Sequence, residues 1–214
     1  MAKLYGGGAS GPWSEQDGGE SPEEGLKLFF EMEQPEVPLF GYRVERTEGE
    51  RVLYSFDVKG QTKVAVIVAR NRADRPGWGP ETSAWCDPAE MPVGFAESKS
   101  YEVWTDRDGE RVPVGELSSR AGPEHCDWQE AHFLEAGAEP DRRMYARDPD
   151  GVLPSEMLKS RYDGNVTMPG DALNTGYRLK HWELSLAADG SNAYIRTPDG
   201  VEAWPAVNEG MGCA

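Results

Sequence analysis

The sequence predicts an α+β fold in which an N-terminal helix packs on an antiparallel β-meander and is followed by a β-rich C-terminal half built of hairpins. Three observations support this prediction: a well-capped amphipathic segment that begins near residue 21, three strand-like runs directly after it, and Asp-Gly turn signals in the last half. The composition agrees, because 25 glycines and 16 prolines in 214 residues indicate many short turns.

The helix is predicted over residues 22–34. Ser21 can cap it, Pro22 suits its first position, and Glu24 completes a capping box. An apolar stripe at i, i+3 and i+4 consists of Leu26, Phe29 and Phe30. A helix with one apolar stripe must lie on an apolar surface, and the next segment can supply it.

The stretch YRVERTEGERVLYSFDVKGQTKVAVIVARN, which begins at Tyr42, predicts three strands. Glu48-Gly49 and Lys59-Gly60 are the expected turns. In the middle strand, apolar and polar residues alternate, so one face should be buried; the apolar positions are Val52, Tyr54, Phe56 and Val58. The third strand is apolar on both faces, which is typical of a central strand.

The rest of the chain is divided by composition. Residues 1–20 are rich in glycine, serine and acids and are expected to form a disordered tail. Residues 21–100 form the helix-plus-meander part and end in a long irregular connection over residues 71–100. Residues 101–214 form the β-rich part and open with a hairpin that turns at Asp108-Gly109. The two parts could also form one continuous domain.

A faint internal repeat occurs in the β-rich part. Residues 144–152, MYARDPDGV, align with residues 193–201, AYIRTPDGV, and the same shift places His132 on His181. The match predicts two long hairpins, each closed by an Asp-Gly turn. Hairpins with Pro-Asp-Gly corners also resemble one another by chance, so both interpretations stay open.

The net charge of −16 argues against some partners. Such an acidic surface repels phosphate backbones, so nucleic acid and anionic membranes are not expected partners. No apolar run is long enough for a transmembrane segment. The first residues lack the apolar core of a signal peptide, so the protein is either cytoplasmic or an exported chain whose leader is absent.

The stretch GPEHCDWQEAHF, residues 122–133, gathers candidate site residues. Cys126 and His125 are ligand types that zinc accepts, which makes a metal-binding module one alternative. In an extended strand, however, His125 and His132 point to opposite faces, and Cys126 lies too far from His132 for one ion. A Cys–His nucleophile pair would need His181 and an orienting carboxylate, and no oxyanion element precedes Cys126.

A disulfide is the favoured role for Cys126. Cys213 is the next-to-last residue, and a cross-link there would tie down a chain end that is otherwise mobile. Closing so long a loop would contribute up to about 4 kcal/mol. Cys86 is the competing partner for either cysteine, so the pairing is open at this point.

Tryptophans are the remaining candidates for ligand binding. Trp78, Trp85 and Trp104 could stack on a sugar or peptide, although such residues more often fill a core. An enzyme, with a hydrolase-type reaction as the alternative function, would place its site in a cleft lined by the 71–100 loop and these tryptophans. No catalytic residue can be assigned, and no cofactor is expected because the phosphate-loop, dinucleotide, G-x-S-x-G and H-E-x-x-H motifs are absent.

Several segments together resemble a group of uncharacterised actinobacterial proteins of secreted or lipoprotein type. The segments are WCDPAE, EHCDWQEAHFL, YARDPDGVL, TGYRLKHWELSLAADGSNAYIRTPDGVEAWP and the terminal GCA. Members of that group typically carry an export or lipoprotein leader, which this chain lacks. The resemblance implies an extracytoplasmic setting and supports the disulfide. It favours a non-catalytic binding or scaffold protein of the cell envelope, with an unknown protein, small-molecule or glycan partner.

Overall fold

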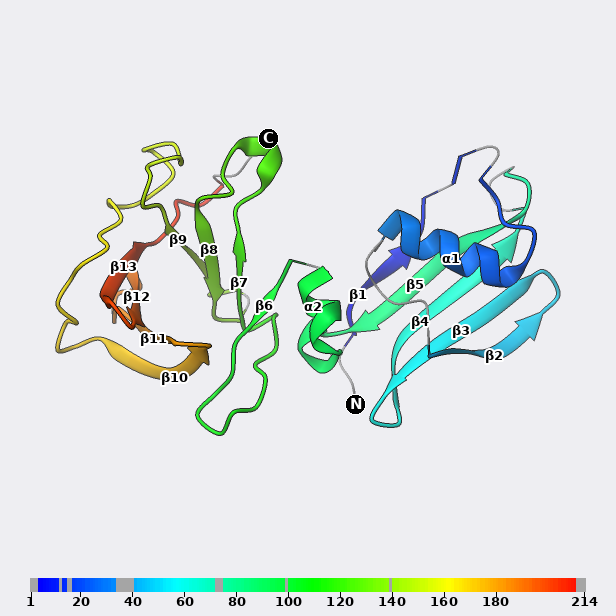
Figure 1. The fold of residues 1–214 in the computed structure, drawn as a ribbon, viewed down its shortest axis with the longest axis horizontal. Coiled ribbons are helices and arrows are strands. Elements are labelled where there is room, and N and C mark those ends of the chain that lie inside the picture. Colours follow the sequence, from blue (N-terminus) through cyan, green and yellow to red (C-terminus); the bar gives the residue numbers. More distant parts are fainter. Residues whose placement is uncertain are drawn as a thin grey trace. The chain divides into compact units, whose positions relative to one another are not determined.

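The computed structural model describes residues 4–11, 13–14, 17–33, 41–71, 75–98, 100–138 and 140–210. The chain divides into two compact units, residues 1–99 and residues 100–214. This division falls beside the boundary expected from the sequence. The two units are described one at a time (Figure 1).

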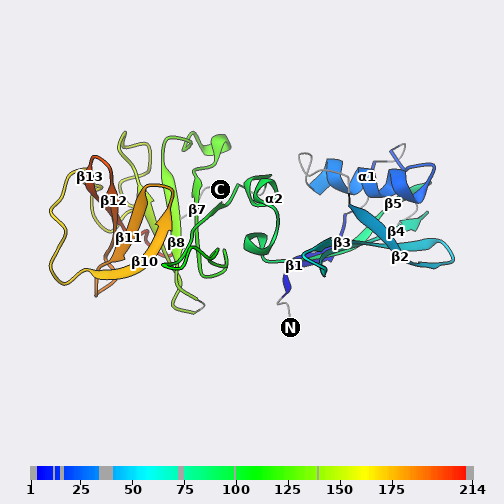
Figure 2. The same cartoon turned by 60° about the horizontal axis from the view of Figure 1, so that its bottom comes forward.

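The first unit is a five-stranded antiparallel sheet with a helix on one face. The strand order is β1-β5-β4-β3-β2. The strands are β1 (Leu4–Ala9), β2 (Tyr42–Glu48), β3 (Arg51–Val58), β4 (Gln61–Arg70) and β5 (Trp78–Cys86). The helices are α1 (Pro22–Glu33), the 3₁₀ turn η2 (Pro88–Glu90) and α2 (Val93–Ser98). Figure 2 shows α1 lying along one side of this sheet.

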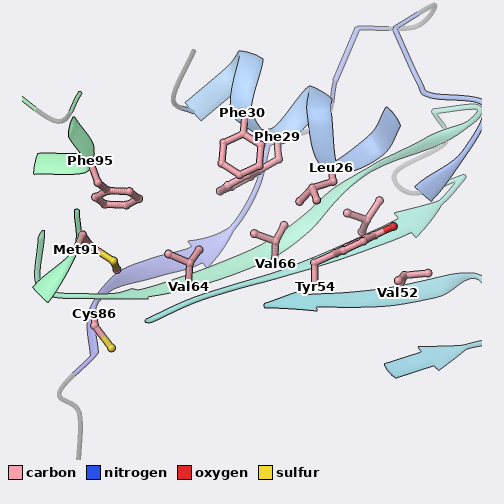
Figure 3. Close-up of a cluster of buried hydrophobic side chains, with 11 residues drawn as sticks. Leu26, Phe29, Phe30, Val52, Tyr54, Val64, Val66, Cys86, Met91 and Phe95 are labelled. Atoms are coloured by element: carbon pink, nitrogen blue, oxygen red, sulfur yellow. The ribbon is translucent and has the colours of Figure 1, made fainter. Parts of the chain in front are cut away.

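Helix α1 begins as the capping pattern predicts. The Glu24 amide donates to Ser21 Oγ at 3.2 Å, and the Glu24 carboxylate accepts the Glu20 amide at 2.6 Å. The apolar stripe of α1 faces the sheet, and Met91 and Phe95 extend the same core beyond the end of β5 (Figure 3). The buried members of this first core are Leu26, Phe29, Phe30, Val52, Tyr54, Val64, Val66, Val68, Cys86, Met91 and Phe95.

The meander of β2, β3 and β4 confirms the strand prediction. The β3–β4 turn is made by Lys59 and Gly60, whose φ angles of 51° and 74° suit a tight two-residue hairpin. Strand β4 lies at the centre of the sheet, between β3 and β5. Val66 and Val68 of β4 are fully buried at 0% exposure. The predicted helix on an antiparallel meander is therefore present.

Two predictions for the first unit were wrong. The first residues are not a disordered tail: β1 pairs with β5, and Trp13 is 2% exposed. Residues 71–100 are not an irregular connection, because they contain β5 and α2. The glycines that suggested disorder instead allow close packing. A Cβ atom at Gly7 would lie 2.4 Å from the Ser83 carbonyl oxygen, and one at Gly18 would lie 1.9 Å from the Pro76 carbonyl oxygen. Gly79 of β5 likewise leaves room for Trp13, because a Cβ atom there would lie 2.3 Å from the Trp13 ring.

The second unit contains two four-stranded antiparallel sheets, as the predicted β-rich half requires. Their strand orders are β6-β7-β8-β9 and β10-β11-β12-β13. The first sheet consists of β6 (Glu102–Val103), β7 (Leu117–Ala121), β8 (His132–Ala136) and β9 (Arg143–Arg147). The second consists of β10 (Leu173–Leu179), β11 (Trp182–Leu186), β12 (Asn192–Thr197) and β13 (Gly200–Pro205).

The two sheets of the second unit are joined at both pairs of edges. Next to β6, Thr105 bridges Arg178 of β10, with two backbone hydrogen bonds of 2.8 Å. Within β9, Tyr145 bridges Ala206, which directly follows β13, and the Val207 amide donates to the Met144 carbonyl at 2.8 Å. The eight strands therefore enclose their interior in a closed, barrel-like arrangement (Figure 1).

Two apolar clusters stabilise the second unit. The second core fills the space between the sheets with Trp104, Val112, Leu117, Leu134, Ala136, Tyr145, Leu184, Ala193, Ile195, Trp204 and Ala206. A smaller third core forms on the other face of β8 and β9, because side chains alternate along a strand. Its buried members are Ala131, Phe133, Ala146, Leu153, Met157 and Val207.

The apparent repeat does not correspond to two equal hairpins. Thr197 pairs with Gly200, so Pro198 and Asp199 form the β12–β13 turn. The matching segment after β9 instead opens a long connection to β10. The hairpin expected at Asp108-Gly109 is present in part, since Thr105 bridges Arg111 across that turn. Across the described ranges, every helix is too short or too polar to cross a membrane.

Candidate binding site

The three tryptophans predicted to bind a ligand lie in apolar cores. Trp78 and Trp85 belong to β5 and pack partly buried against the first core. Trp104 is 0% exposed in the second core. A fully buried ring has no face left for a ligand, so Trp104 does not fit the predicted stacking surface. For Trp78 and Trp85, ligand binding stays a prediction.

The predicted metal ligands lie in a turn rather than in a strand. His125 and Cys126 belong to the 3₁₀ turn η3 (Glu124–Cys126), which Asp127 ends in the left-handed region at φ 59°. Strand β8 begins only at His132. Within the residues that the structure describes, no group of three His, Cys, Asp or Glu side chains could hold a metal ion.

The cysteines differ in state. Cys86 is a free, buried cysteine of the first core, and its burial raises the pKa of the thiol. Cys126 is disulfide-bonded. Cys213 lies outside the described residues, so the Cys126–Cys213 pairing stays a prediction.

A cleft with a volume of about 530 Å³ opens beside η3 on the third core. We call it the aromatic cleft. Its lining consists of Ser100, Arg120, Ala121, Gly122, Pro123, Glu124, His125, Trp128, Phe133, Met144 and Met157. The volume lies in the range of about 300–1,000 Å³ that is usual for small-molecule sites. The stretch of residues 122–133 therefore forms much of this wall.

Backbone hydrogen bonds hold the wall of the aromatic cleft in place. The Gly122 amide donates to the Ala131 carbonyl at 2.9 Å, and the Ala131 amide donates to the Trp128 carbonyl at 2.9 Å. Gly122 is required here, because a Cβ atom would lie 2.1 Å from the Trp128 carbonyl oxygen. The Trp128 ring lies 6.2 Å from the Phe133 ring, centre to centre. The cleft is thus formed before any ligand arrives.

The charges of the aromatic cleft lie on exposed residues. Arg120, Glu124 and His125 are exposed, whereas Phe133 and Met157 are buried. Arg120 pairs with Glu135 at 3.3 Å. An apolar floor with a polar rim suits a ligand that has both an apolar body and a polar group.

A polar network that the sequence analysis did not predict lies at the edge of the second core. His132 Nε2 is 2.7 Å from a Glu102 carboxylate oxygen. The Ser119 hydroxyl donates to the same carboxylate at 2.6 Å and accepts the Trp104 indole N–H at 3.0 Å. Burial alone would raise the pKa of Glu102, but the hydrogen bonds from His132 and Ser119 outweigh it and lower the pKa below its ordinary value.

Aromatic rings surround the imidazole of this network. The His132 ring meets Trp182 at 5.6 Å and Trp204 at 5.8 Å, both edge to face. The Trp204 indole N–H donates to Glu202 at 2.8 Å, and Glu202 pairs with Arg147 at 2.9 Å. Two partly buried carboxylates therefore anchor this region: Glu202 holds Trp204, and Glu102 holds His132 directly and Trp104 through Ser119.

The order of groups in this network differs from that of a nucleophilic triad. In a triad the imidazole accepts the proton of the nucleophilic hydroxyl, and the carboxylate orients the imidazole. Here Glu102 lies between Ser119 and His132 and accepts from both. The Ser119 hydroxyl is therefore not activated by the imidazole. The sequence signal for the network was the strand alternation of Glu102 with Trp104, which places a carboxylate on a core-facing position.

No protein-family model, curated protein or solved structure matches the chain.

Proposed function

We propose that the protein is a non-catalytic, extracytoplasmic binding protein that holds a small ligand in the aromatic cleft. The observation that carries this proposal is the cleft itself, with its volume of about 530 Å³, apolar floor and charged rim. Trp128 supplies a large ring that is only partly buried, and Met144 beside it offers a polarisable side chain. Such a lining favours an amphiphilic ligand with a flat apolar part.

The bonded state of Cys126 supports an extracytoplasmic setting. Disulfides persist in oxidising compartments and are rare in the cytoplasm of most organisms. The resemblance to exported actinobacterial proteins points the same way and suggests association with the cell envelope. A cytoplasmic location is the alternative, and it requires reduced cysteines.

The chemistry of the candidate residues favours binding over the two alternatives. A metal-binding module would need the Cys126 thiolate, and a disulfide-bonded sulfur cannot supply one. A hydrolase would need an activated nucleophile, and Ser119 donates to a carboxylate instead of to an imidazole. Neither alternative therefore has a specific observation in its favour.

Binding of an amphiphilic probe tests the proposed site. We expect the oxidised protein to bind 8-anilinonaphthalene-1-sulfonate at one site, with enhanced probe fluorescence. Trp128→Ala should abolish the saturable signal while the circular dichroism spectrum stays native. Met32→Ala is the matched control, because Met32 is an apolar side chain of the first unit that is 42% exposed. Saturable binding that survives Trp128→Ala would place the ligand elsewhere and contradict the proposal.

Thiol counting tests the proposed location. Protein isolated from its native cells under acid quench should show one free thiol among its three cysteines after denaturation. Three free thiols would contradict an oxidising compartment, whereas binding of the fluorescent probe would be unaffected.

A further inference from the structure

A second cleft of about 530 Å³ lies in the same unit and has a different chemistry. We call it the charged cleft. It is lined by Asp148, Pro149, Asp150, Gly151, Leu153, Ser155, Leu158, Lys159, Ser160, Arg161 and Tyr162. The segment between residues 153 and 158 contributes to both clefts, with Met157 lining the aromatic cleft and Leu158 lining this one.

Hydrogen bonds hold both sides of the charged cleft. On one side the Asp148 carboxylate, which is 9% exposed, accepts the Val152 amide at 2.8 Å and the Leu153 amide at 3.3 Å. On the other side the Lys159 amide donates to the Ala206 carbonyl at 2.9 Å. A cleft with both walls held by hydrogen bonds needs little ordering when a ligand binds.

The two cationic side chains of the charged cleft have no acidic partner among the described residues. Lys159 and Arg161 are exposed, and neither forms an ion pair within the described part of the chain. The neighbouring Arg147, by contrast, is paired with Glu202 at 2.9 Å. In a chain with a net charge of −16, two unpaired cations at one cleft mark a place where an anionic group is stabilised.

The charged cleft also contains hydrogen-bond acceptors. Asp150 is exposed, has no partner among the described residues, and can accept hydrogen bonds from hydroxyl groups. The Ser160 hydroxyl can donate or accept. The cleft thus offers cationic donors and an anionic acceptor together, over a volume suited to a small organic molecule rather than to an inorganic ion.

We propose that the charged cleft binds a sugar acid, a polyhydroxylated ring that carries a carboxylate. Arg161 and Lys159 bind the carboxylate of the ligand. Asp150 accepts hydrogen bonds from the ring hydroxyls, and the Ser160 hydroxyl donates to them or accepts from them. The acidic lining residues disfavour polyanions such as nucleic acids, whose many phosphates would meet Asp148 and Asp150. The proposal for the charged cleft does not rest on the function proposed for the aromatic cleft.

Calorimetric titration of the oxidised full chain tests the proposal. The probes are D-glucuronate, D-galacturonate and N-acetylmuramate, with D-glucose and inorganic phosphate as comparisons. We expect at least one sugar acid to bind at a single site and both comparison compounds to bind at least tenfold more weakly, because each lacks half of the recognised groups. The double variant Lys159→Gln/Arg161→Gln should weaken the sugar acid about tenfold or more, since it removes charged hydrogen-bond donors.

Two control variants show whether the sugar acid binds at the charged cleft itself. Lys59→Gln removes an exposed lysine at a turn of the first unit and should leave binding unchanged. Trp128→Ala should also leave sugar-acid binding unchanged, which distinguishes the two clefts. Absence of binding by all three sugar acids, equal binding of phosphate, or full affinity in the double variant would each overturn the proposal.

Discussion

The two units bury their side chains in different ways. The first core lies between α1 and one face of its sheet, and its members are apolar apart from the Tyr54 hydroxyl and the Cys86 thiol. The second core is enclosed by two sheets and includes the indole groups of Trp104 and Trp204, which donate to Ser119 and Glu202. A sheet that buries one face can form its core from apolar residues at alternate positions of each strand. A closed barrel that buries tryptophans must also supply hydrogen-bond acceptors for their indole N–H groups.

The two units also differ in how far apart in the sequence their paired strands lie. The central strands of the first unit are neighbours in sequence, joined by short turns. The barrel closes only when residues near β6 meet β10 and residues near β9 meet the end of β13. Substitutions in the second unit should therefore lower the free energy of unfolding more than comparable substitutions in a turn of the first unit.

Removing a tryptophan from the barrel should have the largest effect. Trp204 is 0% exposed and touches both His132 and Trp182. We expect Trp204→Ala to lower the free energy of unfolding by about 3–5 kcal/mol, measured by chemical denaturation. Val44→Ala in β2 is the control, because Val44 is 51% exposed and should cost less than about 0.5 kcal/mol. Equal costs for both variants would mean that the second core is not packed as described.

The next largest effect is expected from the bonded cysteine. Cys126→Ser should lower the free energy of unfolding of the oxidised protein by about 2–4 kcal/mol. A reducing agent should destabilise the unmodified protein by a similar amount and leave Cys126→Ser unchanged. Cys86→Ser is the matched control, since Cys86 is free and its variant should stay sensitive to the reductant. Loss of that sensitivity in Cys86→Ser would instead assign Cys86 to the disulfide.

Much of the first unit could be predicted from the sequence. Capping residues and alternating strands act over a few positions, so Ser21, Glu24 and the Lys59-Gly60 turn indicated their structures directly. The first strand could not be predicted in this way. Its glycines resemble a disordered segment, and they form a strand because β5 offers an open edge and Trp13 finds a pocket at Gly79.

The candidate site was harder to predict, because its residues meet through the closed fold. His125 and Trp128 are candidates by residue type, but Met144 and Met157, which also line the cleft, come from later parts of the chain. Glu102 and His132 are joined only when β6 and β8 flank β7. The alternation of Glu102 with Trp104 indicates a core-facing carboxylate, but no local pattern shows that its partner is His132.

A smaller effect, with a dependence on pH, is expected at the Glu102 carboxylate. Glu102→Gln keeps the shape but weakens two charge-assisted hydrogen bonds, and because the Glu102 side chain is 34% exposed the cost should be about 1–2 kcal/mol. The folded state lowers the Glu102 pKa, so its contribution is present above the ordinary value of 4.5 and is lost as the pH falls through the folded value. Unfolding measured from pH 7 to pH 3 should therefore show the variant and the unmodified protein converging on acidification. Glu110→Gln is the control, because Glu110 is an exposed turn residue and its substitution should change the free energy of unfolding at pH 7 by less than about 0.5 kcal/mol. A difference between Glu102→Gln and the unmodified protein that stays constant from pH 7 to pH 3 would contradict the assignment.

The smallest effects should come from two glycines of the first unit that have open space around them. Gly60 has φ 74° in the β3–β4 turn, and a Cβ atom there would meet nothing within 4 Å. Gly60→Ala should therefore cost about 1 kcal/mol through backbone strain alone. Gly94 lies in α2 with equally open surroundings but without a positive φ, so Gly94→Ala should instead stabilise the protein by about 0.5–1 kcal/mol. Changes of opposite sign in the free energy of unfolding for Gly60→Ala and Gly94→Ala would show that turn geometry, and not packing, fixes the register of the meander. Changes of the same sign would exclude the left-handed turn at Gly60.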